Sequence, residues 1–150
     1  MAHAFARIYL HVVFSTKNRE RLLTAEVRPA LHSYAGGILN GLSCVPVAIN
    51  SEPDHMHLLF LLARTVTIAE VVGAVKKSSN DWLKKQGPGF SEFYWQSGYG
   101  AFSVSESAMP RVRDYIREQA EHHRTRSFRD EYRSLLQKHG YDPDNPYIWE

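Results

Sequence analysis

The segment PDHMHLLFLL at residues 53–62 decides the fold and raises the first question about function. From His55 onward it is apolar except for two histidines, which predicts a strand. Side chains alternate along a strand, so His55 and His57 share one face, with Cα atoms about 7 Å apart, and Met56 points into the core. Two imidazoles at that separation can bind one metal ion, although such a pair also occurs on ordinary strand surfaces.

Two imidazoles are too few ligands for a stable metal site, so a third ligand should come from another segment. A carbonyl or carboxylate oxygen in that position would extend the choice of metal to Mg²⁺ or Mn²⁺. Glu52 and Asp54 flank the pair and are reserve candidates only, since we expect one in the turn and the other facing away.

The composition sets the broad class of protein. The chain has 150 residues, of which 43% are apolar and 23% charged, and we expect one domain over residues 1–150. No apolar run approaches the roughly 20 residues of a membrane span, and the first residues lack a basic leader. Cys44 is the only cysteine. Together these features favour a cytoplasmic protein without disulfides or membrane association.

The remaining segments give an order of strands and helices. We expect strands at residues 5–15, 44–50, 55–62 and 101–105, and helices at residues 25–39, 67–85, 107–123 and 128–139. The first six elements then follow the split β-α-β pattern of ferredoxin-like α+β folds, with an antiparallel sheet and two helices on one face. The other face of the sheet is left for a substrate, a partner or the last helices.

The third predicted helix carries the segment PRVRDYIREQAEHHR at residues 110–124. Tyr115 and Gln119 are four residues apart and therefore share a face, with Arg111 one turn earlier. This face is polar, aromatic and basic at once, which is unusual for a core face. The ordinary alternative is that the Tyr115 ring packs on the sheet and only its hydroxyl group forms a hydrogen bond.

At this point the sequence resembles the single-tyrosine HUH transposases, including the REP-associated tyrosine transposases. HUH denotes two histidines around a bulky apolar residue. The resemblance rests on five stretches in the expected order: HVVFSTKNRERLL at 11–23, PDHMHLL at 53–59, GYGAFSVS at 98–105, YIREQ at 115–119 and EHHRTRSFRDEY at 121–132. It implies that Tyr115 is the nucleophile and that Gln119 joins His55 and His57 as a metal ligand.

The resemblance also implies a reaction and partners. Tyr115 would attack a phosphodiester of single-stranded DNA near a hairpin and form a 5′-phosphotyrosine with a free 3′-OH. Mg²⁺ or Mn²⁺ would assist. The family works as a homodimer, often with active sites shared between subunits. His11, His122 and His123 are candidate proton carriers, although any of them can be structural.

DNA binding requires cations for phosphates and aromatic rings for unpaired bases. The net charge of +2 is too small to indicate nucleic acid, but Arg111 to Lys138 contains eight basic and five acidic residues. A solvated helix surface explains that excess equally well. The candidate DNA-binding residues are Lys76, Lys77, Lys84, Arg111, Arg113, Arg117, Arg124, Tyr94 and Trp95.

Two other functions are alternatives, although the presence of all four motif residues does not favour the first. One is a ferredoxin-like nucleic-acid-binding module without strand-transfer activity. The other is a metal-dependent phosphodiesterase in which water attacks the phosphate and Tyr115 merely orients that water.

Overall fold

The computed structural model describes residues 2–149 of the chain. Four strands form one antiparallel sheet in the order β2-β3-β1-β4. The strands are β1 (Tyr9–Ser15), β2 (Val45–Glu52), β3 (His55–Leu61) and β4 (Gly100–Val104). The α-helices are α1 (Arg28–Gly41), α2 (Ile68–Lys84), α3 (Met109–Arg117), α4 (Gln119–His122) and α5 (Phe128–Lys138). This order confirms the predicted ferredoxin-like α+β fold.

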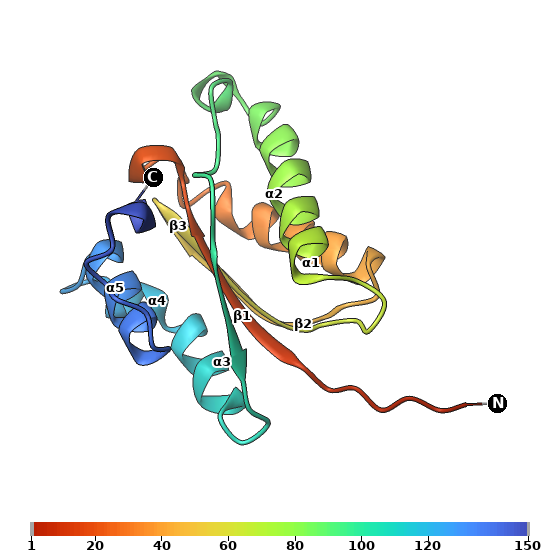
Figure 1. Ribbon diagram of the computed structural model, residues 1–150. Helices are drawn as coiled ribbons and strands as arrows, with labels where there is room; N and C mark the ends of the chain where they lie inside the picture. Colours follow the sequence, from red (N-terminus) through yellow and green to blue (C-terminus); the bar gives the residue numbers. More distant parts are fainter. Residues whose placement is uncertain (1, 150) are drawn as a thin grey trace.

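The helices lie on both faces of the sheet, as Figure 1 shows. Helices α1 and α2 cover one face, and α3, α4 and α5 lie on the other. Strands β3 and β1 occupy the middle of the sheet, so both of their faces are buried. The face that the sequence left open is therefore occupied by the last three helices.

The main hydrophobic core lies between the sheet and α1 and α2. Even-numbered residues of the central strands point into it, among them Phe14, Met56 and Phe60. Odd-numbered residues of the same strands point the other way, so the predicted alternation around Met56 is confirmed. Two-residue periodicity thus assigns one set of side chains to the core and the other set to the face beneath α3–α5.

Strands β2 and β3 form the predicted hairpin, with a tight turn at Pro53 and Asp54. The register of β2 shifts between Pro46 and Ala48. Pro46 has no backbone N–H to donate, which suits its place in an edge strand beside this irregularity. Both features agree with the expected edge position.

The structure corrects several predicted boundaries. The first strand begins at Tyr9 rather than at residue 5, and Phe5 is 97% exposed, because the preceding residues have no strand to pair with. The first helix covers Arg28–Gly41 instead of 25–39. Strand β2 continues to Glu52, which pairs with His55, so Glu52 lies in the strand and only Asp54 lies in the turn.

The predicted helix 107–123 is divided into α3 and α4. The Asn50 side chain donates hydrogen bonds to the carbonyl oxygens of Ile116 at 2.8 Å and Arg117 at 3.3 Å. These bonds from β2 satisfy carbonyl groups at the end of α3. The break fixes the position of Gln119 at the start of α4.

Within residues 2–149, no helix is long and apolar enough to cross a membrane.

Candidate metal centre and tyrosine pocket

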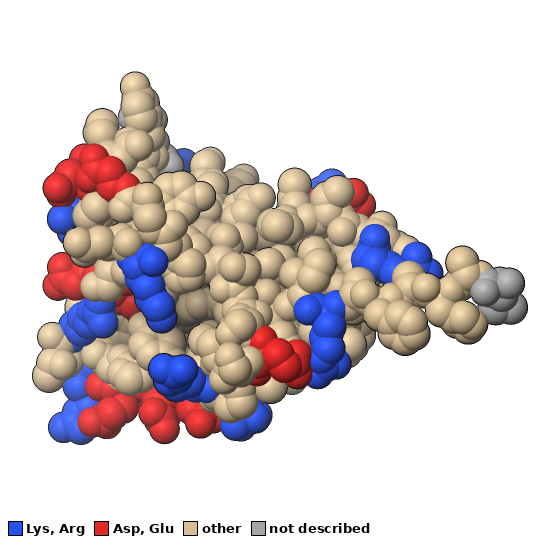
Figure 2. Space-filling view, turned by 60° about the horizontal axis from the view of Figure 1, so that its bottom comes forward, with Lys and Arg blue, Asp and Glu red and all other residues tan. Residues whose placement is uncertain are grey.

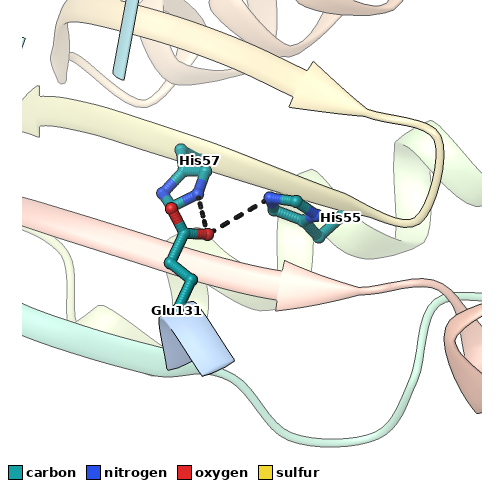
Figure 3. Close-up of side chains that lie close together, drawn as sticks. All are labelled: His55, His57 and Glu131. Atoms are coloured by element: carbon teal, nitrogen blue, oxygen red, sulfur yellow. Dashed lines mark hydrogen bonds and ion pairs between the residues drawn. The ribbon is translucent and has the colours of Figure 1, made fainter. Parts of the chain in front are cut away.

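His55, His57 and Glu131 meet on the face of the sheet beneath α5. Glu131 Oε1 lies 3.3 Å from His55 Nε2 and 3.0 Å from His57 Nε2. Figure 3 shows the two imidazoles on β3 and the carboxylate reaching them from α5. All three residues are buried, and one ligand atom from each lies within 4.8 Å of the others. Two imidazole nitrogens and a carboxylate oxygen form a donor set that fits a divalent metal ion.

The outer nitrogens of both histidines also have partners. His55 Nδ1 lies 2.7 Å from an oxygen of Asp54, and His57 Nδ1 lies 2.8 Å from Nε2 of the buried His11. Such bonds hold an imidazole in one orientation and leave its inner nitrogen directed at the centre. The reserve candidate Asp54 thus supports a ligand, and His11 contacts a ligand rather than the centre itself.

Without a metal ion, the charged groups of the site shift the pKa values of one another. Burial lowers the pKa of His55, but its bonds to Asp54 and Glu131 outweigh that effect and raise the pKa to about 9. Burial raises the pKa of Glu131, yet hydrogen bonds from the surrounding histidines hold it well below its usual range. Burial also lowers the pKa of His57. At neutral pH a His55 cation therefore faces a Glu131 carboxylate.

Tyr115 and Gln119 reach the same carboxylate from α3 and α4. The Tyr115 hydroxyl donates a short hydrogen bond to Glu131 Oε2, and Gln119 Nε2 donates to that oxygen at 2.9 Å. Gln119 Oε1 lies 3.1 Å from His55 Nε2. The four residues that the sequence singled out thus lie together within one chain. Burial and Glu131 raise the pKa of the Tyr115 phenol.

The two neighbouring histidines after α3 have different surroundings. The His122 ring stacks on Tyr115 with centroids 4.5 Å apart. His123 Nε2 lies 3.1 Å from Glu131 Oε1, and its Nδ1 lies 2.6 Å from the Arg126 carbonyl oxygen. His123 therefore links the centre to the loop before α5, whereas His122 covers the nucleophile candidate.

A cleft of about 600 Å³ opens beside Tyr115 and Glu131, between β4, α3 and α5. Its walls include Arg111, Arg126 and Lys138 as well as apolar side chains. On the face shown in Figure 2, basic side chains are interspersed with acidic ones rather than joined in one continuous patch. On this face, DNA phosphates would therefore contact separate lysine and arginine side chains rather than one continuous basic patch.

The other candidate DNA-binding residues are dispersed. Lys76, Lys77 and Lys84 belong to α2, which lies on the opposite face of the sheet. Lys76 also donates to two carbonyl oxygens of the 96–98 loop, and Lys84 lies 3.7 Å from the Tyr94 ring centroid. The structure brings none of these to the metal centre.

Trp95 is only 6% exposed, and its indole N–H donates to Ser79 in the core. Its ring is therefore unavailable to a base, whereas Tyr94 is 49% exposed. On the side of the centre, Arg111 lines the cleft and Arg117 is exposed, whereas Arg113 pairs with Asp114 and Arg124 with Glu121.

Sequence reasoning missed Glu131. It follows Phe128 by three residues on α5, so it stands on the buried face of that helix with Phe128 and Leu136. The sequence places this carboxylate within an apolar stripe of a helix. That position would have indicated a functional residue, because acidic side chains are rarely buried without a partner.

A histidine pair in a candidate metal centre and a half-buried tyrosine beside it, on a ferredoxin-like sheet, are the features of single-tyrosine HUH nucleases. Residues 4–119 match the family described as IS200-like transposases, and the chain belongs to this family. It is a transposase-family enzyme. Glu131 lies beyond the matched residues.

Three relatives extend the comparison. The chain is 28% identical to the ISDra2 transposase TnpA of Deinococcus radiodurans over 116 residues, which is 73% of this chain and 81% of that protein. A crystal structure assigned as a transposase of D. radiodurans R1 matches with a TM-score of 0.63 and 24% identity, over 79% of this chain and 95% of the other. A REP-associated tyrosine transposase bound to a REP hairpin matches with a TM-score of 0.60 and 15% identity, over 97% and 88%. The two structures show that the fold is shared.

Proposed function

We propose that this enzyme cleaves and rejoins single-stranded DNA through a covalent bond between Tyr115 and a 5′-phosphate. The observation that carries the proposal is the meeting of the Tyr115 hydroxyl with the histidine pair around Glu131. The phenol oxygen attacks phosphorus, the bond to the 3′-oxygen breaks, and that oxygen leaves as a 3′-OH. The phosphotyrosine keeps the energy of the phosphodiester, so a later 3′-OH can reverse the step.

The residues suited to hold Mg²⁺ or Mn²⁺ are His55, His57 and Glu131, with Gln119 Oε1 as a further oxygen donor. A bound cation would polarise a nonbridging phosphate oxygen. The imidazole ligands favour Mn²⁺ over Mg²⁺, whereas the oxygen ligands suit both.

Glu131 divides its two oxygens between the histidines and the nucleophile. Oε1 faces the imidazoles, and Oε2 accepts from both Tyr115 and Gln119. The Tyr115 phenol is protonated at neutral pH, as any tyrosine is, and its raised pKa makes the proton still harder to remove as the oxygen attacks. Glu131 Oε2 already accepts a hydrogen bond from that hydroxyl, so Glu131 is the nearest acceptor for the proton.

The proposed substrate is a single strand that carries a hairpin. The chain shares its fold with a transposase described as bound to a REP hairpin. Arg111, Arg126 and Lys138 around the cleft offer cations for the strand beside the nucleophile.

We also propose a homodimer. Tyr115 and the histidine pair of one chain are already in contact, which supports a site built within a single subunit. Exchange of α3 between subunits is the alternative. A mixture of Tyr115→Phe and His57→Ala proteins tests it, because the mixture forms an adduct only when the helix of one subunit completes the site of another.

The main test uses single-stranded DNA with a hairpin, Mn²⁺, and a label on either end. A protein adduct should carry the 3′-labelled fragment, and the 5′-labelled fragment should be released. Tyr115→Phe should abolish both products. Cleavage that persists in Tyr115→Phe without an adduct would establish water as the nucleophile instead. Salt-sensitive binding without any cleavage by the unaltered enzyme would establish a binding module.

A further inference from the structure

A second pocket lies on the other side of the metal centre from the Tyr115 cleft. It has a volume of about 380 Å³ and lies between the β2–β3 turn and residues 120–128. Its walls combine two carboxylates, three guanidinium groups and one phenyl ring, from Glu52, Asp54, Arg21, Arg124, Arg126 and Phe128. Of its arginines, the function proposed above uses only Arg126, and it gives no role to Glu52.

This pocket shares a wall with the metal centre. The Phe128 ring stacks on His55 with centroids 4.4 Å apart, and His123, which bonds to Glu131, also borders the pocket. Arg126 lines both this pocket and the Tyr115 cleft. A strand whose phosphate lies at the centre can therefore extend into the cleft on one side and into this pocket on the other.

Glu52 supplies the observation that points to a ligand. It is only 8% exposed, and its Oε2 accepts a hydrogen bond from Arg28 at 3.2 Å. Its other oxygen, Oε1, is buried and has no hydrogen-bond partner among residues 2–149. A buried carboxylate oxygen without a donor is costly, and such groups in native proteins call for a donor from elsewhere.

The chemistry of the walls favours one base over the others. Guanine presents two adjacent donors, N1–H and N2–H, to a carboxylate. Adenine and cytosine each place an acceptor nitrogen beside their amino group, and thymine flanks its single N–H with two carbonyl groups. An acceptor directed at Glu52 and Asp54 would be repelled, so only guanine offers an edge made mostly of donors.

We propose that this pocket binds one unpaired guanine nucleotide of the DNA strand, adjacent to the phosphate that Tyr115 attacks. Its base donates to Glu52 and lies near the Phe128 ring, while its phosphate is neutralised by the surrounding arginines. This inference rests on the proposed function, because that function identifies the bound strand as single-stranded DNA. Glu52 is then a specificity-determining residue that acts before any bond is broken.

Binding measurements on the Tyr115→Phe protein test the pocket separately from the chemistry. The probe is a labelled hairpin with four randomised nucleotides on either side, from which bound molecules are selected and sequenced. We expect guanine to be enriched at one flanking position. Replacing that guanine with inosine, which lacks only the N2 amino group, should weaken binding about tenfold or more, the equivalent of one hydrogen bond to a charged group.

The protein side uses Glu52→Gln, which keeps the shape and a bond to Arg28 but replaces one acceptor with a donor. This variant should bind the guanine and inosine strands equally. Glu26→Gln, an exposed acid near the start of α1, should keep the preference. Arg124→Gln should weaken all strands alike and lower the salt slope by about one.

The absence of guanine enrichment at every position would overturn the proposal, and so would a guanine preference that survives Glu52→Gln. The inosine comparison in Tyr115→Phe needs no change at Glu52, so it decides the question even if that variant fails to fold. Guanine selectivity without any Tyr115 adduct would retain the pocket and reject the proposed chemistry. An adduct without guanine selectivity would retain the proposed chemistry and reject the guanine pocket.

Discussion

The two faces of the same sheet differ in chemistry. On the α1 and α2 face, β1 and β3 present Leu10, Phe14, Met56 and Phe60 to an apolar core. On the α3–α5 face, the intervening positions present His11, His55 and His57. Both faces are buried, but the second buries polar groups that bond to one another.

Alternate residues of one strand therefore serve two purposes: those on the apolar face stabilise the fold, and those on the polar face build the candidate metal centre. Apolar burial is nondirectional, so the first face stabilises the fold whatever the details of its contacts. The polar face requires a partner at each nitrogen and oxygen, which fixes the orientation of every ring. A change on the apolar face should therefore act mainly on folding, whereas a change on the polar face should also act on metal binding and catalysis.

The largest expected effect comes from the apolar face. Phe60→Ala removes a fully buried ring and should lower the free energy of unfolding by about 3–5 kcal/mol. Urea unfolding followed by circular dichroism measures this. Leu61→Ala, the next residue on the opposite face and only partly buried, is the matched control and should cost clearly less. Equal costs would mean that the faces do not differ in this way.

The next effect is a pH dependence specific to the polar face. The pKa of His55 is raised to about 9, above its usual value near 6.5, so its charge stabilises the fold fully below pH 6.5. Without metal, this contribution should be lost as pH rises from 6.5 through 9, by about 3 kcal/mol at most.

Unfolding in EDTA at several pH values between 7 and 9.5 measures this slope. His11 and His57 have lowered pKa values, so they change their protonation below this pH range. Among these three histidines, only His55 titrates between pH 7 and 9.5. His55→Asn should remove the slope. A stability that rises with pH in the unaltered protein would contradict the assigned charge state.

Glu131→Gln tests whether the carboxylate from α5 is a ligand. Loss of a direct ligand should weaken Mn²⁺ binding at least as much as the roughly 10- to 100-fold loss typical of supporting residues. Isothermal titration calorimetry with Mn²⁺ gives the affinity. Asp130→Asn, the exposed neighbour, is the control. Unchanged or tighter binding in Glu131→Gln would show that Glu131 occupies the centre only when metal is absent.

The smallest expected effect concerns how α5 is seated. A Cβ atom at Gly100 would lie 2.9 Å from ring atoms of Phe102 and of Tyr132 on α5. Gly100→Ala should therefore displace α5 slightly, at a cost of about 1 kcal/mol, because only the ends of two side chains must move. Thermal unfolding measures the cost, with Gly37→Ala, where a Cβ meets nothing within 4 Å, as control. An unchanged midpoint would show that α5 tolerates the shift.

Much of the site could be predicted from sequence because its parts have local signatures. A spacing of two places His55 and His57 on one face of a strand, and a spacing of four places Tyr115 and Gln119 on one face of a helix. The break between α3 and α4 was not predictable in this way, because it depends on Asn50 from a distant strand.

The sequence by itself determined the order of the elements, the alternation along β3 and the identity of the tyrosine and histidine motifs. Only the tertiary structure decided that Glu131 lies between these motifs, that His11 and Asp54 orient the imidazoles, and that a second pocket adjoins the centre. The physical reason is the distance along the chain between the interacting residues. Periodicity arises from the geometry of one strand or helix, whereas a carboxylate more than 70 residues away reaches a histidine only after the sheet and α5 have packed together.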